Sequence, residues 1–164
     1  MIRHGTIFTI ATNGSKKDMG GTFAWIIETH DKTTIAEGMG PVHGHSPTMT
    51  SHRTELYGMT SAHEFLFQLC QFYTITTSTT EVHSICDNIE CVNKTNTAKC
   101  NLCGTSRFLS PDYDIESRLR HIIHRAPFTT SSTWVKGHQD SGKRPRILSL
   151  EAQLNIIADK LTGE

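Results

Sequence analysis

The stretch IFTIATNGS, residues 7–15, decides the fold of this chain. Its first six residues are apolar or β-branched, which favours a strand, and Asn13-Gly14-Ser15 follows as a polar turn. Ligands of α/β proteins bind outside the carboxyl ends of the strands. We therefore expect Asn13 to face a functional site.

The composition is that of an ordinary globular protein. The 164 residues are 36% hydrophobic and 20% charged, so we expect a single domain over residues 1–164. Lys plus Arg and Asp plus Glu both number 16, so the overall charge gives no argument for nucleic acid. No apolar run approaches the roughly 20 residues of a membrane span. The start of the chain lacks a signal-peptide core, and the five cysteines are irregularly spaced. These features predict an intracellular protein, cytoplasmic or nuclear and not secreted, with reduced thiols.

Strand signals dominate the first quarter of the chain. We expect strands over Ile7–Thr12, Thr22–Glu28 and Thr33–Met39, joined tightly enough to form an antiparallel meander. A helix is expected over about Ser51–Tyr73, where apolar residues recur every three or four positions. A short strand is expected next, over Val82–Cys86.

The second half alternates helices with one more strand. A short helix is expected from Asn88 to about Thr95, and Ser110-Pro111-Asp112 is typical of a helix start. The fifth strand is expected at Thr133-Trp134-Val135, and a last helix begins near Ser149. That helix should bury Leu150, Leu154, Ile157 and Leu161. The order β-β-β-α-β-α-α-β-α predicts an α/β fold with a mixed five-stranded sheet and helices on both faces.

Three acidic residues are expected to converge on Asn13. Glu55 lies near the start of a helix, Asp87 ends a strand, and Asp159 lies on the last helix, each beside apolar residues. Such carboxylates repel one another unless a cation is present, and their oxygens suit Mg²⁺. Two ions about 4 Å apart would stabilise the attacking and leaving oxygens of a phosphoryl displacement. His138, on a glycine-containing loop, could shuttle a proton.

Five motifs in this order resemble type 1 ribonuclease H over nearly the whole chain. They are Thr12-Asn13-Gly14-Ser15, Arg53-Thr54-Glu55-Leu56, Cys86-Asp87-Asn88, Trp134-Val135-Lys136-Gly137-His138 and Asn155-Ile156-Ile157-Ala158-Asp159-Lys160-Leu161. The resemblance implies a ribonuclease H-like fold and an endonuclease that cuts the RNA strand of RNA/DNA hybrids. It also implies two Mg²⁺ ions as cofactors, with Mn²⁺ as a possible substitute.

The same resemblance implies roles for individual residues. The four acidic positions of the family, which are catalytic and hold metal, correspond to Asn13, Glu55, Asp87 and Asp159, and its loop histidine corresponds to His138. The implied nucleic-acid contacts are Gly14 and Ser15 with RNA 2′-hydroxyls, Thr50 and Arg53 with DNA-strand phosphates, and Asn88. Contacts to 2′-hydroxyls allow a protein to tell RNA from DNA.

Asn13 departs from the family pattern, which has an aspartate that bridges both metals at this position. An amide offers an oxygen but no negative charge, so we expect weaker metal binding and an inactivated or weakened enzyme. We interpret the chain as an Asp-to-Asn variant. An engineered substitution is favoured because the other three acids and His138 are intact, and a natural loss stays open.

The segment Asn96–Leu109 bears on the subclass. It contains only Lys99 and Arg107 as cations, so the basic protrusion of some bacterial members is not evident. This resembles retroviral or retrotransposon ribonuclease H domains, which borrow substrate affinity from an attached reverse transcriptase. The implied partners are an RNA/DNA hybrid and a covalently linked reverse transcriptase in a longer polyprotein, and none is a membrane.

Two other functions stay open. One is a non-catalytic ribonuclease H-like module that binds hybrid or a protein partner. The other is a transposase or integrase core of the same fold, against which the Trp134–His138 motif counts. The basic segment Lys143–Arg146 either touches nucleic acid or is solvated.

A zinc site is a weaker alternative. Cys100 and Cys103 have the spacing of half such a site, for which Cys91 or the pair His121 and His124 would supply further ligands. A single Cys-x-x-Cys pair is a weak signal, and the two histidines are better interpreted as the exposed end of a helix.

Overall fold

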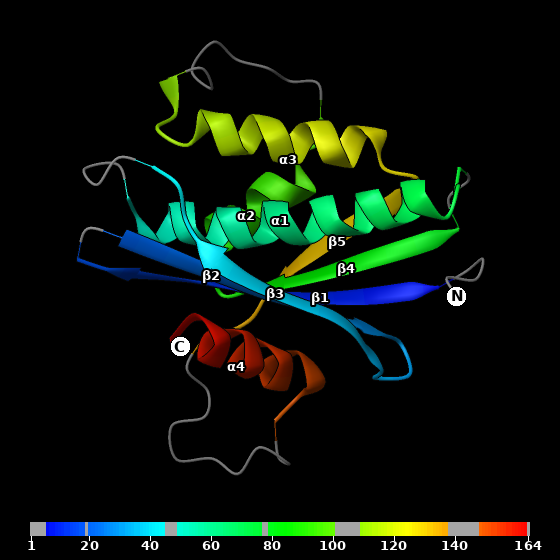
Figure 1. Ribbon diagram of the computed structural model, residues 1–164, viewed down its shortest axis with the longest axis horizontal. Coiled ribbons are helices and arrows are strands. Elements are labelled where there is room, and N and C mark those ends of the chain that lie inside the picture. The colour runs from blue at the N-terminus through cyan, green and yellow to red at the C-terminus, as the bar shows by residue number, and fades with distance from the viewer. Residues whose placement is uncertain are drawn as a thin grey trace.

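The structure is a computed structural model that describes residues 6–18, 20–44, 49–76, 79–100, 109–137 and 148–163. Within these ranges five strands form one mixed sheet in the order β3-β2-β1-β4-β5. Figure 1 shows α1 against one face of the sheet with α3 outside it, and α4 against the other face. The predicted fold class and element order are therefore confirmed. The elements are β1 (Ile7–Lys17), β2 (Gly20–Thr29), β3 (Thr34–Pro41), α1 (Ser51–Phe72), β4 (Thr80–Cys86), α2 (Ile89–Asn96), α3 (Tyr113–Arg125), β5 (Phe128–Trp134) and α4 (Leu150–Gly163).

β1 lies at the centre of the sheet. It pairs antiparallel with β2 from Phe8 opposite Thr29 onward, and parallel with β4 up to Ala11 opposite Ile85. Parallel pairing brings the carboxyl ends of β1 and β4 to the same end of the sheet. Asn13 and Asp87 each follow the Ala11–Ile85 pair by two residues, so the register brings them to neighbouring positions.

The predicted turn at Asn13-Gly14-Ser15 is wrong, because β1 continues through it to Lys17. β2 pairs with all three residues, and the chain turns only after β1, where Asp18 adopts a left-handed φ of 47°. Gly14 is needed for a close approach: a Cβ built on it would collide with the backbone of Thr54 and Glu55 in α1. The glycine therefore allows α1 to lie directly against β1.

Alternate residues of β1 serve the two faces of the sheet, as the pleat of a strand requires. Phe8 and Ile10 pack in the core beneath α1, whereas Ala11 packs with Leu154 and Ala158 of α4. By the same alternation Thr12 faces α1 and Asn13 faces α4.

Several predicted boundaries and faces need correction. β5 begins at Phe128 because its Ser/Thr-rich residues pair with the whole of β4. Ser110 is not the N-cap of α3: the helix begins at Tyr113, with Asp112 as its N-cap residue. Ile157 is 39% exposed, because α4 turns Leu154 and Ala158 toward the sheet instead. Tyr73, expected as the last residue of the first helix, lies just beyond α1 and is 52% exposed.

Among the described residues, no helix combines the length and the apolar character that a membrane span requires.

Candidate metal centre

Asn13 and Asp159 are in direct contact. The Asn13 side-chain Nδ2 donates a hydrogen bond to Asp159 Oδ1 at 2.7 Å, and Asn13 Oδ1 accepts one from the Gly14 N–H at 2.8 Å. Asn13 is 4% exposed. Both polar atoms of its amide are thus engaged, one with an acceptor and one with a donor. An aspartate at position 13 would keep the bond from Gly14 but would have no proton for Asp159.

Glu55 lies in the early part of α1, where the helix meets the sheet, and is 4% exposed. Burial raises the pKa of Glu55 well above its usual range, and the neighbouring Cys86 and Asp87 add to the rise, while a backbone hydrogen bond from Gly14 opposes it. A carboxyl group in such a place is stabilised either by keeping its proton or by binding a cation.

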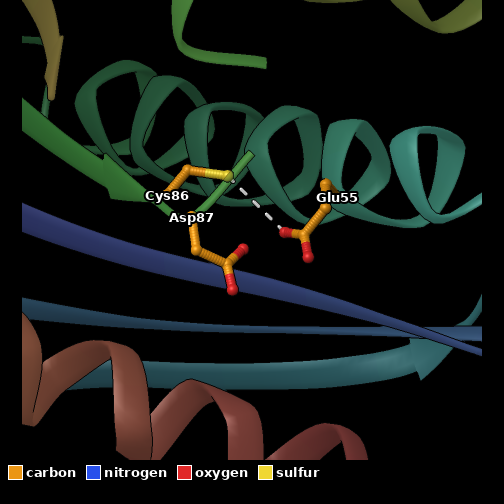
Figure 2. A group of neighbouring side chains, drawn as sticks. All are labelled: Glu55, Cys86 and Asp87. Atoms are coloured by element: carbon orange, nitrogen blue, oxygen red, sulfur yellow. Dashed lines mark hydrogen bonds between the residues drawn. The ribbon is translucent and has the colours of Figure 1, made fainter. Parts of the chain in front are cut away.

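Cys86 and Asp87, at the end of β4, complete a compact group with Glu55. One ligand atom from each residue lies within 4.8 Å of the others, and within the described ranges this is the single group of three or more potential metal-ligating side chains. Figure 2 shows the carboxylates of Glu55 and Asp87 and the thiol of Cys86 turned toward a common space. The Cys86 thiol donates to Glu55 Oε2 at 3.5 Å.

Gly14 connects this group with the Asn13–Asp159 pair. Its N–H reaches Asn13 Oδ1, its backbone contacts the Glu55 carboxyl group, and its α-carbon lies against the Glu55 backbone. Together with the β1–β4 register, these contacts place Asn13, Glu55, Asp87 and Asp159 at one end of the sheet. His138, the fifth residue that the sequence points to, lies outside the described residues.

The end of β5 supports Asp87. Trp134 Nε1 donates to the Asp87 carbonyl at 2.8 Å, and the Val135 N–H donates to the Cys86 carbonyl at 3.1 Å. A Cβ on Gly137 would collide with the Asp87 carboxylate. The Trp134 indole and the absence of a side chain at Gly137 thus give these two motif residues a structural role beside Asp87.

Arg53 is buried, and its guanidinium is already paired with carboxylates of the same chain. Its guanidinium pairs with Asp112 Oδ1 at 3.0 Å and with Asp114 Oδ2 at 2.8 Å, and it also donates to the His43 carbonyl. Arg53 is 6% exposed. The cluster ties the start of α1 to the start of α3 and occupies the guanidinium that a DNA-strand phosphate would need.

Thr50 and Asn88 both cap helices. The Thr50 hydroxyl accepts the Arg53 N–H at 3.0 Å, and Asn88 Oδ1 accepts the N–H groups of Glu90 and Cys91. Thr50 is exposed and Asn88 is half-buried, as are Gly14 and Ser15 on β1. Their contacts with nucleic acid stay predictions.

The alternative zinc ligands do not gather among the described residues. Cys91 is buried beside Cys86 in the core between α1, α2 and α3, whereas Cys100 is exposed. His121 and His124 are exposed near the end of α3, as expected. Cys103 and the basic segment Lys143–Arg146 lie outside the described residues.

Two residues near the centre were missed by sequence reasoning, Cys86 and Thr12. The signal for Cys86 was its place directly before Asp87, since neighbouring residues at a strand end point to opposite faces and this one faces α1. Thr12 could have been found in the same way, because it directly precedes Asn13 and faces α1. Its side chain is fully buried, near the Cys86 thiol.

Comparisons with known proteins agree on the fold. No family model matches the chain, and no curated protein matches it by sequence. Among solved structures, the N-terminal RNase H domain of a Mycobacterium tuberculosis protein, fused to maltose binding protein, is 14% identical with a TM-score of 0.61 over 96% of both chains. LC11-RNase H1 in complex with RNA/DNA hybrid is 14% identical with a TM-score of 0.64 over 95% of this chain and 94% of that one. The PFV RNase H domain is 15% identical with a TM-score of 0.61 over 97% and 92%. At these identities the likeness establishes the fold, and this chain has the ribonuclease H-like fold.

Proposed function

We propose that the chain is a ribonuclease H domain whose site serves Mg²⁺-dependent, two-metal hydrolysis of the RNA strand of RNA/DNA hybrids. Asn13 leaves this chain inactive or weakened. The observation that supports the proposal is the meeting of Asn13, Glu55, Asp87 and Asp159 beside the carboxyl end of β4, where its parallel pairing with β1 stops. In α/β sheets this is the end at which ligands bind.

The donor set suits a hard divalent cation. Three carboxylates and one amide oxygen are the ligand types that Mg²⁺ prefers. The burial that raises the pKa of Glu55, together with the nearby Asp87, is a condition that a cation would relieve. When bound, two such ions would stabilise the attacking and leaving oxygens of the displacement.

Asn13 weakens the site through its hydrogen bond. The amide places an N–H group 2.7 Å from Asp159 Oδ1, where the proposed enzyme would need a negatively charged oxygen. The same observation favours the second candidate function, a non-catalytic module that binds hybrid without cutting it. In that case the Asn13–Asp159 hydrogen bond would replace the metal as the bridge between β1 and α4.

A groove beside the centre supports contact with a nucleic-acid strand. A cavity of about 290 Å³ opens next to Ser15 and is lined in part by Lys17, Thr22 and Thr162. Lys17 is exposed and supplies positive charge there. The backbone of Gly14 and Ser15 would meet RNA 2′-hydroxyls, and Thr50 and Asn88, which do not line this cavity, would add contacts elsewhere along the hybrid.

The proposal includes a retroelement origin. The segment Asn96–Leu109 has only two cations, and the chain as a whole has no net charge. Such a domain would gain substrate affinity from a covalently linked reverse transcriptase. Comparing hybrid affinity at low and physiological salt tests whether the domain alone makes few phosphate contacts, because the affinity of such a domain depends only weakly on salt.

The proposed activity is tested by cleavage of a labelled RNA/DNA hybrid. The chain and its Asn13→Asp variant are compared in Mg²⁺ and in Mn²⁺, with duplex DNA as the substrate control. We expect cleavage of the RNA strand by Asn13→Asp alone, or at a far higher rate than by the parent.

The variant Asn13→Asp/Asp87→Asn is the matched control. It has the same number of carboxylates as the parent, and we expect it to be silent because Asp87 is lost. Silence of Asn13→Asp itself, with hybrid binding intact in both proteins, would favour the non-catalytic module.

A further inference from the structure

The centre contains a thiol that a site for Mg²⁺ alone does not need. Cys86 is fully buried, and its Sγ lies 3.5 Å from Glu55 Oε2, in the group that also contains Asp87 (Figure 2). Thiolate sulfur is a soft ligand that favours Zn²⁺ over Mg²⁺. The metal preference of the centre therefore depends on whether Cys86 takes part.

The distances already suit a tetrahedral zinc site. Bonds of about 2.3 Å to sulfur and about 2.1 Å to oxygen at the tetrahedral angle place the two ligand atoms about 3.6 Å apart. The observed separation of Cys86 Sγ and Glu55 Oε2 is 3.5 Å. An ion could thus bridge these two side chains without moving them apart.

Two further side chains line the same space. Thr12 is 0% exposed, and its hydroxyl contacts the Cys86 thiol but makes no hydrogen bond of good geometry among the described residues. A buried hydroxyl without a well-formed hydrogen bond is able to bind a water or a ligand. The Cys91 thiol also contacts Cys86, in the core formed with α2.

We propose that Glu55, Cys86 and Asp87 form a binding site for a thiophilic divalent cation of the Zn²⁺ class. Binding converts the Cys86 thiol into a thiolate and releases its proton to solvent. Glu55 and Asp87 supply two carboxylate oxygens, and a water held by Thr12 completes the coordination. The binding itself follows from the contacts above, whereas its consequence for catalysis rests on the proposed function: Zn²⁺ would compete with Mg²⁺ for Glu55 and Asp87.

Metal titration tests the site. The reduced protein carries Cys100→Ser and Cys103→Ser, which remove the Cys-x-x-Cys pair, and Zn²⁺ is titrated against a chromophoric chelator. Co²⁺ serves as a second probe, because a cobalt–thiolate bond gives an intense charge-transfer absorption. We expect one tightly bound Zn²⁺ and that absorption, and Cys86→Ser should remove the absorption and weaken Zn²⁺ binding at least about tenfold.

Cys70→Ser is the matched control, since Cys70 is also buried but packs in the separate core beneath α1. It should leave both signals unchanged. Glu55→Gln is a second probe that keeps the thiol, and it should weaken Zn²⁺ while the cobalt–thiolate absorption persists at higher Co²⁺. Circular dichroism establishes that each variant is folded. Equal Zn²⁺ affinity of Cys86→Ser and its parent, or a parent without cobalt–thiolate absorption, would overturn the proposal.

The outcome is separable from that of the proposed function. If Asn13→Asp does not cleave hybrid while the parent shows the Cys86-dependent absorption, the zinc site stands and the nuclease proposal fails. If Asn13→Asp cleaves in Mg²⁺ and Zn²⁺ inhibits it equally with and without Cys86, the nuclease proposal stands and the zinc site fails.

Discussion

The substitution Asn13→Asp should destabilise the metal-free protein and make its stability depend on Mg²⁺. In the structure the Asn13 amide donates to Asp159 Oδ1 at 2.7 Å and accepts the Gly14 N–H at 2.8 Å. Aspartate has nearly the same shape and keeps the second bond. It replaces the first with two carboxylate oxygens that face each other inside a site that is 4% exposed at position 13.

The size of the effect follows from two contributions. Losing a hydrogen bond to a charged acceptor costs about 1.5–3 kcal/mol. Two like charges that relax to about 4 Å repel by about 1 kcal/mol in water and by about 4 kcal/mol at an effective dielectric constant of 20. We therefore expect a loss of about 2.5–7 kcal/mol in the free energy of unfolding near neutral pH. The loss should shrink in acid, as the two carboxyl groups come to share a proton.

Urea unfolding followed by circular dichroism measures this loss in EDTA and in rising concentrations of Mg²⁺. Because a ligand stabilises the state it binds by RT ln(1 + [L]/Kd), Mg²⁺ should restore much of the lost stability in Asn13→Asp and change the parent little. The control is Asn13→Asp/Asp159→Asn, which exchanges the two side chains. It should recover a hydrogen bond between positions 13 and 159 and lose most of the Mg²⁺ dependence.

The reasoning fails if Asn13→Asp is as stable as the parent in EDTA, since the two carboxylates would then not face each other. It also fails if Mg²⁺ stabilises the parent and Asn13→Asp by the same amount, because position 13 would then not contribute to metal binding.

Three further changes test the scaffold. Gly14→Ala should lower the free energy of unfolding by about 1–3 kcal/mol, because the added Cβ would press on the backbone of α1. Gly163→Ala should have little effect, because no atom lies within 4 Å of the added Cβ. Chemical denaturation measures both changes. Arg53→Met should lower the free energy of unfolding by about 3–5 kcal/mol, because it leaves a buried carboxylate unpaired. Arg118→Met breaks an exposed ion pair and should lower it by about 0–1 kcal/mol. A comparable loss in both variants would refute this reasoning. Burial lowers the pKa of His63 from its ordinary 6.5 to about 4, so stability is fully present above pH 6.5 and falls as the pH drops toward 4, by about 3 kcal/mol in all. His63→Gln should flatten that part of the pH profile of stability, and an unchanged slope would show that other groups cause it.

The order of the helices and strands could be predicted because each element has a local sequence signal. The errors lie where a contact with a residue distant in the sequence determines the local structure. The Asn13-Gly14 pair is a strong turn signal, yet β2 pairs with it and α1 packs on the glycine. Ser110 carries a good cap signal, but Arg53 holds Asp112 and the helix begins after that residue. The contacts with α1 and β2 that overrule these local turn and cap signals cannot be predicted from the neighbouring residues alone.

The site was predictable from the order of its motifs, although only Asp87 directly follows the end of a strand, whereas Asn13 lies within β1 and Asp159 within α4. Asn13 and Asp159 meet as the motif order implied, and Glu55 and Asp87 lie together. The use of Arg53 could not be foreseen, because a cation near a helix start suits a phosphate as well as a buried acid. Its two partners, the N-cap residue Asp112 and Asp114 in the first turn, lie at the start of α3, about 60 positions away in the sequence.

Asn13 and Cys86 shift the metal preference of the same site in the same direction, each by a different means. The amide N–H of Asn13 partly neutralises Asp159, so the oxygen-rich side of the centre, toward α4, has a weaker attraction for a hard cation. Cys86 lies on the other side of the centre, toward α1. The described hydrogen bonds of Asn13 go to Asp159 and Gly14, so they do not reduce the ability of the Cys86 thiol or of Glu55 to bind a metal. The preference of this chain should therefore shift from Mg²⁺ toward Zn²⁺, and restoring aspartate at position 13 should shift it back. The ratio of Mg²⁺ to Zn²⁺ affinity, measured in the parent, in Asn13→Asp and in Cys86→Ser, should accordingly rise in both variants, and it should rise most when the two changes are combined.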